Sequence, residues 1–386
     1  MKLLFLEWNS LCNEDMIPAF ERMGHVVVRV LYDERNPKEE QHAKINKELD
    51  KGGFDFIFSF NYFPDISELC MEKGIKYVAW VYDSPYINLY SYTVINPCNY
   101  IFIFDYAVYE ELHLGNISTV YYLPMAVSAR RLSSIKNTEL MRRKHQCDVA
   151  LVGSLYTEEK HNLYKKFDTV APFVKGYLDG IINAQLQVYG CNFIQELLTP
   201  DIVDEMQKVY PTNPNALTAT TPEFIYAEYV LNRRVTALER QAILERLSKE
   251  HKVHVYTHDR NARIGNTKNL GPVDYYDEMP YVFMNAGINL NITLRSIKTG
   301  IPLRAMDIMG CGGFLMTNYQ QEFFEYFKDG EEFDFYASME ELQDKTAFYL
   351  QHEEIRKKVA QAGCRLVREE HTFEKRIESM LSVLKG

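Results

Sequence analysis

The chain has 386 residues, of which 46% are hydrophobic and 13% aromatic, so it is long enough for two domains and apolar enough to bury large cores. Its formal net charge of −10 argues against a nucleic-acid partner held by nonspecific phosphate contacts, because that mode of binding requires a basic surface. The seven cysteines are odd in number and include no Cys-x-x-Cys pair, so we expect free thiols and neither a disulfide framework nor a zinc site.

The first residues resemble a signal peptide only briefly. Charged Glu7 and polar Asn9 interrupt the apolar start before a usable hydrophobic region forms, so the segment is better explained as a first strand. No run approaches the roughly 18 consecutive apolar residues of a membrane-spanning helix. We therefore expect a cytoplasmic protein without a membrane span.

Short apolar or aromatic runs recur through the first third of the chain, separated by polar segments that are compatible with helices. Such runs are typical of a parallel sheet covered on both faces, so they predict a Rossmann-like domain. The first run is not followed by Gly-x-Gly-x-x-Gly, which disfavours a dinucleotide-dependent dehydrogenase. The predicted strands are residues 3–6, 26–31, 56–60, 77–82, 100–104 and 120–123.

The basic, polar stretch of residues 130–146 is the predicted linker between an N-terminal domain, residues 1–145, and a C-terminal domain, residues 146–386. The second domain opens with a strand over residues 148–152, after which Gly153 lets the chain turn sharply. Further strands are predicted over residues 253–256, 287–291 and 314–317, and the charged, periodic tail from residue 340 is predicted to be helical.

Residues 157–250 do not continue the alternation of strands and helices. Thr221 and Pro222 supply an N-cap and a first helical residue, and apolar residues follow at three- and four-residue spacing. This stretch therefore predicts a largely helical insertion in the second domain.

The segment of residues 301–317 combines charged side chains, glycines and an apolar strand. Arg304 and Asp307 are three residues apart and share one face of the predicted helix. The first turn of a helix offers free backbone N–H groups to a diphosphate, while Asp307 can accept hydrogen bonds from a ribose diol. These residues predict a nucleotide-sugar site; the alternative is an ordinary salt bridge.

This segment resembles the nucleotide-binding helix of GT-B glycosyltransferases of family 4, with Asp307, Cys311 and Gly312 on that family's Glu, Cys and Gly. The resemblance implies a GT-B fold, two Rossmann-like domains facing a cleft, in which the C-terminal helix returns to the first domain. It also implies a nucleotide-diphospho-sugar donor, by default a UDP-sugar, in the second domain and an acceptor in the first.

A more specific resemblance is to the CgeB (spore-maturation type) glycosyltransferase group. It covers the last 130 or so residues best. The residues that carry it are Asn289-Leu-Asn-Ile-Thr293, Arg304, Gly310-Cys-Gly-Gly313, His371-Thr-Phe373 and Arg376, with Trp80, Asp83-Ser-Pro85 and Val152-Gly-Ser154 upstream.

One position departs from the family pattern. Family-4 enzymes carry a first Glu eight positions before the residue matched by Asp307, and Thr299 stands there in this chain. A threonine hydroxyl can still bond a phosphate or a sugar hydroxyl, but it carries no charge.

Further donor-binding candidates follow the predicted strands. The loop after residues 287–291 is rich in phosphate-compatible groups and predicts a diphosphate cradle, although an ordinary polar loop is the alternative. Backbone N–H groups of Gly153 and Ser154 can serve the same diphosphate, and His258 follows a strand and can contact phosphate or sugar. The cradle residues are Asn291, Arg295, Ser296 and Thr299, with Lys298 and Lys160 as possible additions.

The stretch from Asn269 to Pro280 resembles the loop that borders the nucleobase in GT-B enzymes. By that resemblance, backbone groups near Val273 would read a uracil edge while Tyr275 or Tyr276 stacks on a ring. The alternative is a plain turn with Asp274 as a helix N-cap.

Asp83 is the candidate catalytic base. It follows a predicted strand and precedes Ser84-Pro85, which places a carboxylate at the strand's carboxyl end, where it can deprotonate an acceptor hydroxyl if the reaction inverts the anomeric centre. The alternative is a turn-forming aspartate. Other open candidates are Glu7, Asp15, Asp105, His113 and His258.

No two aspartates in the chain are two positions apart, so the Asp-x-Asp motif of metal-dependent GT-A enzymes is absent. We therefore expect metal-independent transfer of a sugar to a hydroxyl of a protein or surface glycan, with no cofactor besides the donor. The leaving diphosphate would be neutralised by Arg304, Arg295 and helix N-termini. Two alternatives remain, a nucleotide-sugar epimerase or hydrolase on the same fold and a non-catalytic nucleotide-sugar-binding protein.

Overall fold

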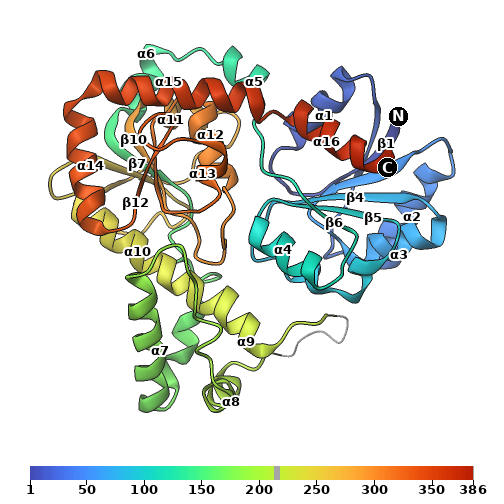
Figure 1. Ribbon diagram of the computed structural model, residues 1–386, viewed down its shortest axis with the longest axis horizontal. Coiled ribbons are helices and arrows are strands. Elements are labelled where there is room, and N and C mark those ends of the chain that lie inside the picture. Colours follow the sequence, from blue (N-terminus) through green and yellow to red (C-terminus); the bar gives the residue numbers. More distant parts are fainter. Residues whose placement is uncertain (213–217, 386) are drawn as a thin grey trace. The chain divides into compact units, whose positions relative to one another are not determined.

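The structure is a computed structural model that describes residues 1–212 and 218–385. The described residues form two compact units. Unit 1 contains residues 1–131, 218–219 and 368–385, and unit 2 contains residues 132–212 and 220–367. Each unit is built on its own six-stranded sheet (Figure 1).

The sheet of unit 1 is entirely parallel, with the strand order β2-β1-β3-β4-β5-β6. All six strands coincide with the predicted apolar runs to within one residue at each end. Their bounds are β1 Lys2–Glu7, β2 Val26–Leu31, β3 Phe56–Phe60, β4 Lys76–Val81, β5 Asn99–Ile103 and β6 Val120–Tyr122.

Helices cover both faces of this sheet, which explains why its strands are continuously apolar. Phe5, Phe58 and Trp80 face α1 and α16, where Phe20 and Phe373 meet them. The opposite face packs on α2, α3 and α4. The helix bounds in unit 1 are α1 Asn13–Arg22, α2 Lys38–Leu49, α3 Pro64–Lys73, α4 Tyr106–Leu114 and α16 Phe373–Lys385, with 3-10 turns η1 Ile87–Tyr90 and η2 Tyr92–Ile95.

The C-terminal tail is fastened to unit 1 by a buried polar cluster. Arg376 donates from Nε to the carbonyl of Pro124 at 2.8 Å and from Nη2 to the carbonyl of Met125 at 3.1 Å. The same Nη2 lies 2.6 Å from Nδ1 of His371, and the backbone of Val127 donates to the carbonyl of His371. The His371 and Arg376 side chains singled out in the sequence thus hold the tail beside the end of β6.

The sheet of unit 2 is also parallel, with the order β12-β11-β10-β7-β8-β9. Four strands match predicted runs, whereas β9 and β12 were not predicted because they are only two and three residues long. The bounds are β7 Cys147–Val152, β8 Val253–Tyr256, β9 Lys268–Asn269, β10 Ala286–Asn291, β11 Leu315–Asn318 and β12 Asp334–Tyr336. Two parallel sheets with flanking helices confirm the expected α/β fold class.

The alternating residues of β10 show how unit 2 is layered. Ile288 and Leu290 pack in the core that α10 and α14 cover, while Asn289 turns the other way and donates to the carbonyl of Phe283 in α11. The helices around the sheet are α10 Asn232–Leu247, α11 Met279–Asn285, α12 Leu303–Gly310, α13 Phe323–Tyr326, α14 Met339–Gln351 and α15 Glu353–Glu370.

The stretch expected as a linker contains two short helices, α5 Ala129–Ser134 and α6 Glu139–His145. The hydroxyl of Thr138 caps α6 by accepting from the N–H of Met141. The amides of Asn137 and Asn285 exchange hydrogen bonds, so α6 is held against α11. A local cap and a non-local amide pair therefore give order to a basic stretch that carries no apolar periodicity.

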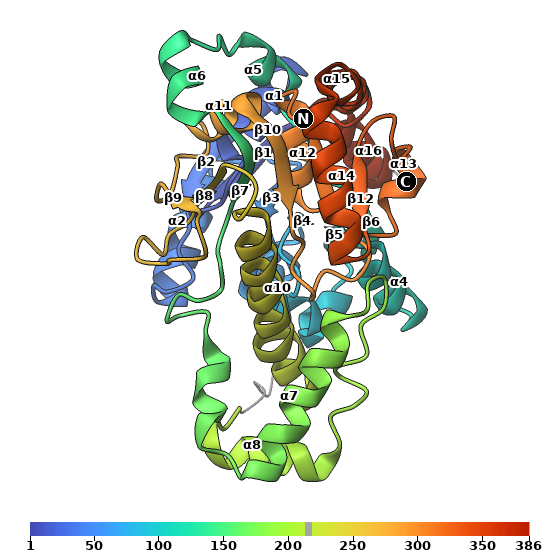
Figure 2. The same cartoon turned by 90° about the vertical axis from the view of Figure 1, so that its left-hand side faces the viewer.

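Between β7 and β8 the chain makes a helical excursion with its own apolar core (Figure 2). Thr221 caps α9 as expected, since its hydroxyl accepts from the N–H of Phe224. A π-helical stretch, η4 Tyr226–Leu231, then joins α9 to α10. The other elements of the excursion are η3 Leu163–Thr169, α7 Pro172–Leu186, α8 Pro200–Val209 and α9 Pro222–Ile225.

Among the described residues, none of the helices combines the length and the apolar composition that crossing a bilayer requires.

Candidate functional site

The strand order of unit 2 creates a topological switch point between β7 and β10. The chain leaves β7 toward β8 on one side, and later leaves β10 toward β11 on the other. In open α/β sheets, ligands bind outside the carboxyl ends of the two strands at such a point. The loops after Val152 and Asn291 therefore bound the candidate donor site, and five of the twelve predicted donor residues lie on them: Gly153, Ser154, Arg295, Ser296 and Thr299.

The loop after β7 is shaped by two residues with positive φ. Gly153 has φ 151°, a backbone angle that residues other than glycine rarely adopt, and Tyr156 has φ 57°. The Ser154 hydroxyl donates to Glu158 at 2.7 Å, and the N–H of Leu155 donates to the same carboxylate at 3.3 Å. Burial acts to raise the pKa of Glu158, but these hydrogen bonds leave it lowered, so the carboxylate is held ionised beside Ser154.

Arg240, which the sequence reasoning missed, spans the switch point. Its guanidinium comes from α10 and donates to the carbonyls of Ser154 and Ile292, one from each loop. The side chain is buried, and its Nε has no hydrogen-bond partner among the described residues. A signal was present in the sequence, because Arg240 interrupts the buried stripe formed by Thr236, Ile243 and Leu247.

All four predicted cradle residues bond to other parts of unit 2. Asn291 is buried and donates to the hydroxyls of Thr293 and Thr317, both at 2.9 Å. Ser296 is buried and donates to the carbonyl of Glu228 at 2.6 Å. These side chains therefore stabilise the loop after β10 in the described structure, and a direct phosphate contact from them stays a prediction.

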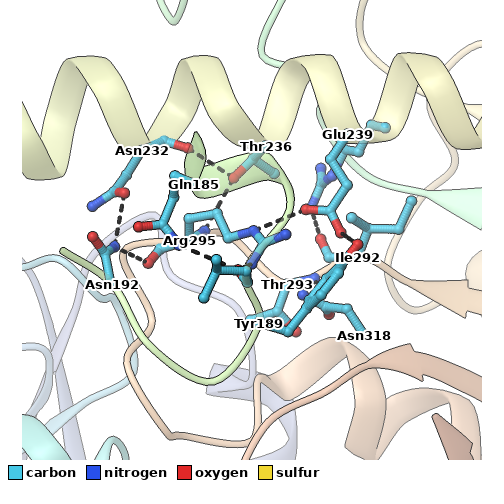
Figure 3. Close-up of polar contacts among 12 residues, drawn as sticks. Gln185, Tyr189, Asn192, Asn232, Thr236, Glu239, Ile292, Thr293, Arg295 and Asn318 are labelled. Carbon is cyan, nitrogen blue, oxygen red and sulfur yellow. Dashed lines mark hydrogen bonds and ion pairs between the residues drawn. The ribbon is translucent and has the colours of Figure 1, made fainter. Parts of the chain in front are cut away.

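Arg295 forms a buried ion pair with Glu239 of α10 (Figure 3). Its Nε donates to Glu239 at 3.0 Å, its Nη1 donates to the carbonyl of Val188 at 2.9 Å, and its guanidinium lies 4.2 Å from the centre of the Tyr189 ring. The Tyr189 hydroxyl donates to the same carboxylate at 2.8 Å. Nη2 of Arg295 has no hydrogen-bond partner among the described residues.

Backbone contacts complete this cluster (Figure 3). The N–H of Arg295 donates to the Thr236 hydroxyl at 3.0 Å, and the carbonyl of Arg295 accepts from the Asn192 amide at 2.9 Å. Because Asn192 lies between α7 and α8, the cluster joins the helical excursion to the loop after β10. We call Tyr189, Asn192, Thr236, Glu239 and Arg295 the Arg295 cluster.

The structure brings together Tyr275, Arg304 and Asp307. The Tyr275 hydroxyl donates to Oδ1 of Asp307 at 2.9 Å, and Nη1 of Arg304 lies 3.7 Å from Oδ2 of Asp307. Arg304 also contacts the sulfur of Met279. Asp307 is buried, whereas Arg304 and Tyr275 are half-buried, so the group combines a carboxylate, a cation and an aromatic ring at the edge of α12.

Thr299 lies next to a carboxylate that the sequence analysis did not identify. Its hydroxyl donates to Oε1 of Glu322 at 2.7 Å, and the N–H of Glu322 donates to the carbonyl of Thr299 at 3.2 Å. Glu322 is buried and follows β11. A carboxyl group therefore stands beside position 299, contributed by a residue 23 positions further along the chain.

The remaining donor candidates are more scattered. His258 is exposed after β8, and Val273 lies half-buried in the loop before α11, two residues from Tyr275. Gly312 lies apart from the group of Tyr275, Arg304 and Asp307. It has φ 79° and follows the C-terminal end of α12, where it lines a cavity of 870 Å³ with residues from the starts of β7 and β10. Its observed role is to end the helix, since a left-handed conformation there favours glycine.

Asp83 lies in unit 1 at the carboxyl end of β4. The Asn61 amide donates to its Oδ2 at 2.7 Å, and the carbonyl oxygen of that amide accepts from the N–H groups of Tyr82 and Asp83. The side chain reaches solvent, yet desolvation by the surrounding protein raises the pKa of Asp83, while the bond from Asn61 acts to lower it. A carboxylate with a raised pKa and a fixed orientation has the properties of a proton acceptor.

No group of three or more His, Cys, Asp or Glu side chains able to hold a metal ion occurs within the described ranges.

Part of the chain matches a known family model. Residues 233–382 match the family model described as glycosyl transferase-like. No match was found among curated proteins. The matched segment includes α10 from Arg233 onward, the Tyr275, Arg304 and Asp307 group, and Glu322.

Solved structures share the fold at low sequence identity. HepE from Anabaena, in complex with UDP-glucose, has a TM-score of 0.55 at 9% identity, with 100% of this chain and 99% of that chain covered. Sucrose-phosphate synthase from Thermosynechococcus elongatus has a TM-score of 0.54 at 8% identity, covering 100% and 98%. WaaG, a glycosyltransferase of lipopolysaccharide biosynthesis, has a TM-score of 0.51 at 10% identity and full coverage of both chains.

These similarities confirm the expected GT-B fold and support the expected assignment to the transferases. Residues 233–382 of this chain are thus similar to the glycosyl transferase-like family, and the chain has the GT-B fold.

Proposed function

We propose that the protein transfers a sugar from a nucleotide-diphospho-sugar, with UDP as the nucleotide, to a hydroxyl of a glycan or protein. The observation that carries this proposal is the group of Tyr275, Arg304 and Asp307, which is built on α12, the helix that follows β10 along the chain. A buried carboxylate can accept hydrogen bonds from both hydroxyls of a ribose, and a neighbouring guanidinium can contact phosphate. Solved complexes of HepE with UDP and UDP-glucose on the same fold support the choice of nucleotide.

The charge on the leaving diphosphate would be neutralised by side chains without a metal ion. Arg304 borders the Asp307 carboxylate, Arg240 spans the two loops of the switch point, and Nη2 of Arg295, on the loop after β10, has no hydrogen-bond partner among the described residues. Guanidinium groups match phosphate oxygens in geometry and stay charged at any physiological pH. Activity in the presence of a chelator is the expected result, and activity that requires added magnesium or manganese would contradict this part of the proposal.

Asp83 is the proposed base for an acceptor bound in unit 1. In an inverting displacement its carboxylate takes the proton of the acceptor hydroxyl, the hydroxyl oxygen forms a bond to the anomeric carbon, and the bond from that carbon to the diphosphate breaks. The amide of Asn61 would keep the carboxylate oriented throughout. The prediction for Asp83→Asn is loss of transfer with donor binding retained.

The CgeB-type subgroup remains our proposal for the closer relationship. It is supported by the residues that carried the resemblance, because several of them have structural partners of their own. His371 and Arg376 hold the tail in unit 1, and Arg304 borders Asp307.

Donor binding is tested by differential scanning fluorimetry with nucleoside diphosphates and nucleotide-sugars. A ligand that binds the folded state raises its melting temperature. A shift with UDP or a UDP-sugar that is lost in Asp307→Asn is the expected result, and product analysis with donor alone then separates transfer from hydrolysis or epimerisation. The absence of a shift with every nucleotide would overturn the proposal.

A further inference from the structure

Unit 1 has a switch point of its own. Its sheet order places β1 between β2 and β3, so the chain leaves β1 toward one side and later continues on the other. Two adjoining cavities, of 700 Å³ and 370 Å³, lie at the carboxyl ends of these strands. They share lining from Tyr32, Glu34, Asn36, Gln41 and Phe63, and we call them together the β1–β2 pocket.

The walls of the β1–β2 pocket are aromatic and rigidly held. The ring of Phe63 lies 4.7 Å from that of Tyr32 and 5.8 Å from that of Trp8, centre to centre. The indole of Trp8 is fixed by a hydrogen bond of 2.6 Å from its Nε1 to the carbonyl of Phe60, and it stacks on Tyr82. Flat, immobile rings of this kind can pack against an apolar ligand face with little loss of side-chain entropy.

A buried hydrogen-bond donor lines both cavities. Gln41 is 2% exposed, and its Oε1 accepts from the N–H of Asp33 at 3.3 Å. Its Nε2 has no hydrogen-bond partner among the described residues. Leaving a buried amide donor without a partner costs free energy, so a ligand oxygen that accepts from it would be bound more tightly.

The charges around the pocket select against ionic ligands. Glu7 is paired with Arg29, Asp33 with Arg35, and Lys38 with Glu68. Glu34 is exposed and makes no hydrogen bond or ion pair within the described ranges, and partial desolvation by the surrounding protein, together with Asp65 and Asp33, raises the pKa of its carboxyl. An anionic ligand would be repelled by this carboxylate.

A hydroxyl group can form hydrogen bonds with both Gln41 and Glu34, whereas a charged group can bond favourably with only one of them. An ammonium group can donate to Glu34 but offers no acceptor for the amide of Gln41. A hydroxyl both donates and accepts, and a ring bearing several hydroxyls on an apolar face matches the aromatic walls as well.

We propose that the β1–β2 pocket binds an uncharged saccharide ring, with Gln41 and Glu34 contacting its hydroxyls and Trp8, Tyr32 and Phe63 forming its walls. Its use as the acceptor subsite rests on the proposed function; the binding itself does not. Trp8 stacks on Tyr82, the residue before Asp83, so the pocket and the proposed base share the carboxyl edge of one sheet.

Saturation-transfer difference NMR tests the proposal on the full-length protein without donor. The probes are the methyl glycosides of glucose, galactose, mannose and N-acetylglucosamine, with glucuronic acid as the charged counterpart. At least one neutral glycoside is expected to bind, glucuronic acid is not, and Gln41→Leu and Glu34→Ala are each expected to weaken binding by about tenfold. Glu39→Ala, on the exposed side of α2, is the matched control and should bind normally.

Unchanged melting temperatures show that the variants fold, and Glu34→Ala removes only an exposed side chain if Gln41→Leu proves unstable. No binding of any neutral probe, or binding by both pocket variants that is as tight as that of the wild type, would overturn the proposal. A parallel titration with UDP keeps the two proposals separate: UDP binding without saccharide binding refutes only the pocket, and saccharide binding without UDP binding refutes only the donor site.

Discussion

The hydroxyl of Tyr275 donates to the carboxylate of Asp307 over 2.9 Å. These residues lie 32 positions apart, on the loop before α11 and on α12, and their contact joins that loop to the helix. A ribose diol bound to Asp307 would replace this hydroxyl as donor, and the freed tyrosine could then pack against the nucleoside.

Asp307→Asn should raise the dissociation constant for UDP by about tenfold or more, because a carboxylate accepts hydrogen bonds more strongly than an amide oxygen. Tyr275→Phe should change it much less, since the ligand itself supplies the lost bond. Isothermal titration calorimetry measures both. Asp277→Asn, an exposed residue of the same loop, serves as the control. Equal affinities of wild type and Asp307→Asn would remove Asp307 from the donor site.

Arg240→Met should destabilise unit 2 by about 2–4 kcal/mol, because the carbonyls of Ser154 and Ile292 both lose a charged donor while remaining enclosed. Arg240→Lys should recover only part of this, since an ammonium group cannot span two loops as a guanidinium does. Urea unfolding provides the free energies, and Arg246→Met, on the exposed side of the same helix, should be nearly neutral. Full recovery by lysine would mean that charge alone matters at this position.

The buried pair of Arg295 and Glu239 should be far more sensitive to the loss of one partner than of both. Glu239→Gln is expected to cost about 3–5 kcal/mol, because it leaves a buried guanidinium uncompensated. The double variant Glu239→Leu with Arg295→Met should cost clearly less than the sum of the two single changes. A double-mutant cycle by denaturant unfolding measures the coupling, and additive losses would show that the two charges act independently.

Acidification should destabilise the attachment of the C-terminal tail. Burial, and then the charge of Arg376, lowers the pKa of His371 to about 3, compared with 6.5 for an ordinary histidine. The folded state therefore binds this proton less readily than the unfolded state does. The neutral His371 side chain therefore contributes to the free energy of unfolding in full above pH 6.5. This contribution is lost as the pH falls toward 3, at up to about 1.4 kcal/mol per pH unit.

Unfolding free energies of wild type and His371→Gln between pH 8 and pH 4 test this dependence. The variant should have the shallower slope. Burial also lowers the pKa of His254, to about 4, so a residual slope of the same sign should remain in the variant. Identical slopes would show that His371 does not titrate differently on unfolding.

The sequence was sufficient to predict most strands because both sheets are covered on two faces, which makes their strands continuously apolar. The exceptions confirm the reason: β9 and β12 lie at sheet edges, and Asp334 in β12 accepts hydrogen bonds from Lys345 and Tyr349. Similarly, α6 carries no apolar periodicity and depends on the Thr138 cap and on contacts with α11.

Partners of polar side chains were much harder to predict. Arg295 and Ser296 were assigned to phosphate from their place in the chain, but in the structure they bond to Glu239 and Glu228, more than 50 residues away in the sequence. Which polar group is used internally depends on how the helical excursion packs on the loop after β10. That packing is a tertiary property, and no local pattern specifies it. The carboxylate of Glu322 beside Thr299 was missed for the same reason.

The packing of α16 on the first sheet has a consequence for synthesis on the ribosome. Trp80 of β4 meets the ring of Phe373 at 6.0 Å, so part of one face of this sheet is covered by residues translated after all of unit 2. Domains generally fold in the order in which they emerge. Here the nascent first sheet must wait with an aromatic surface uncovered, and the part of the protein that is made first is completed last.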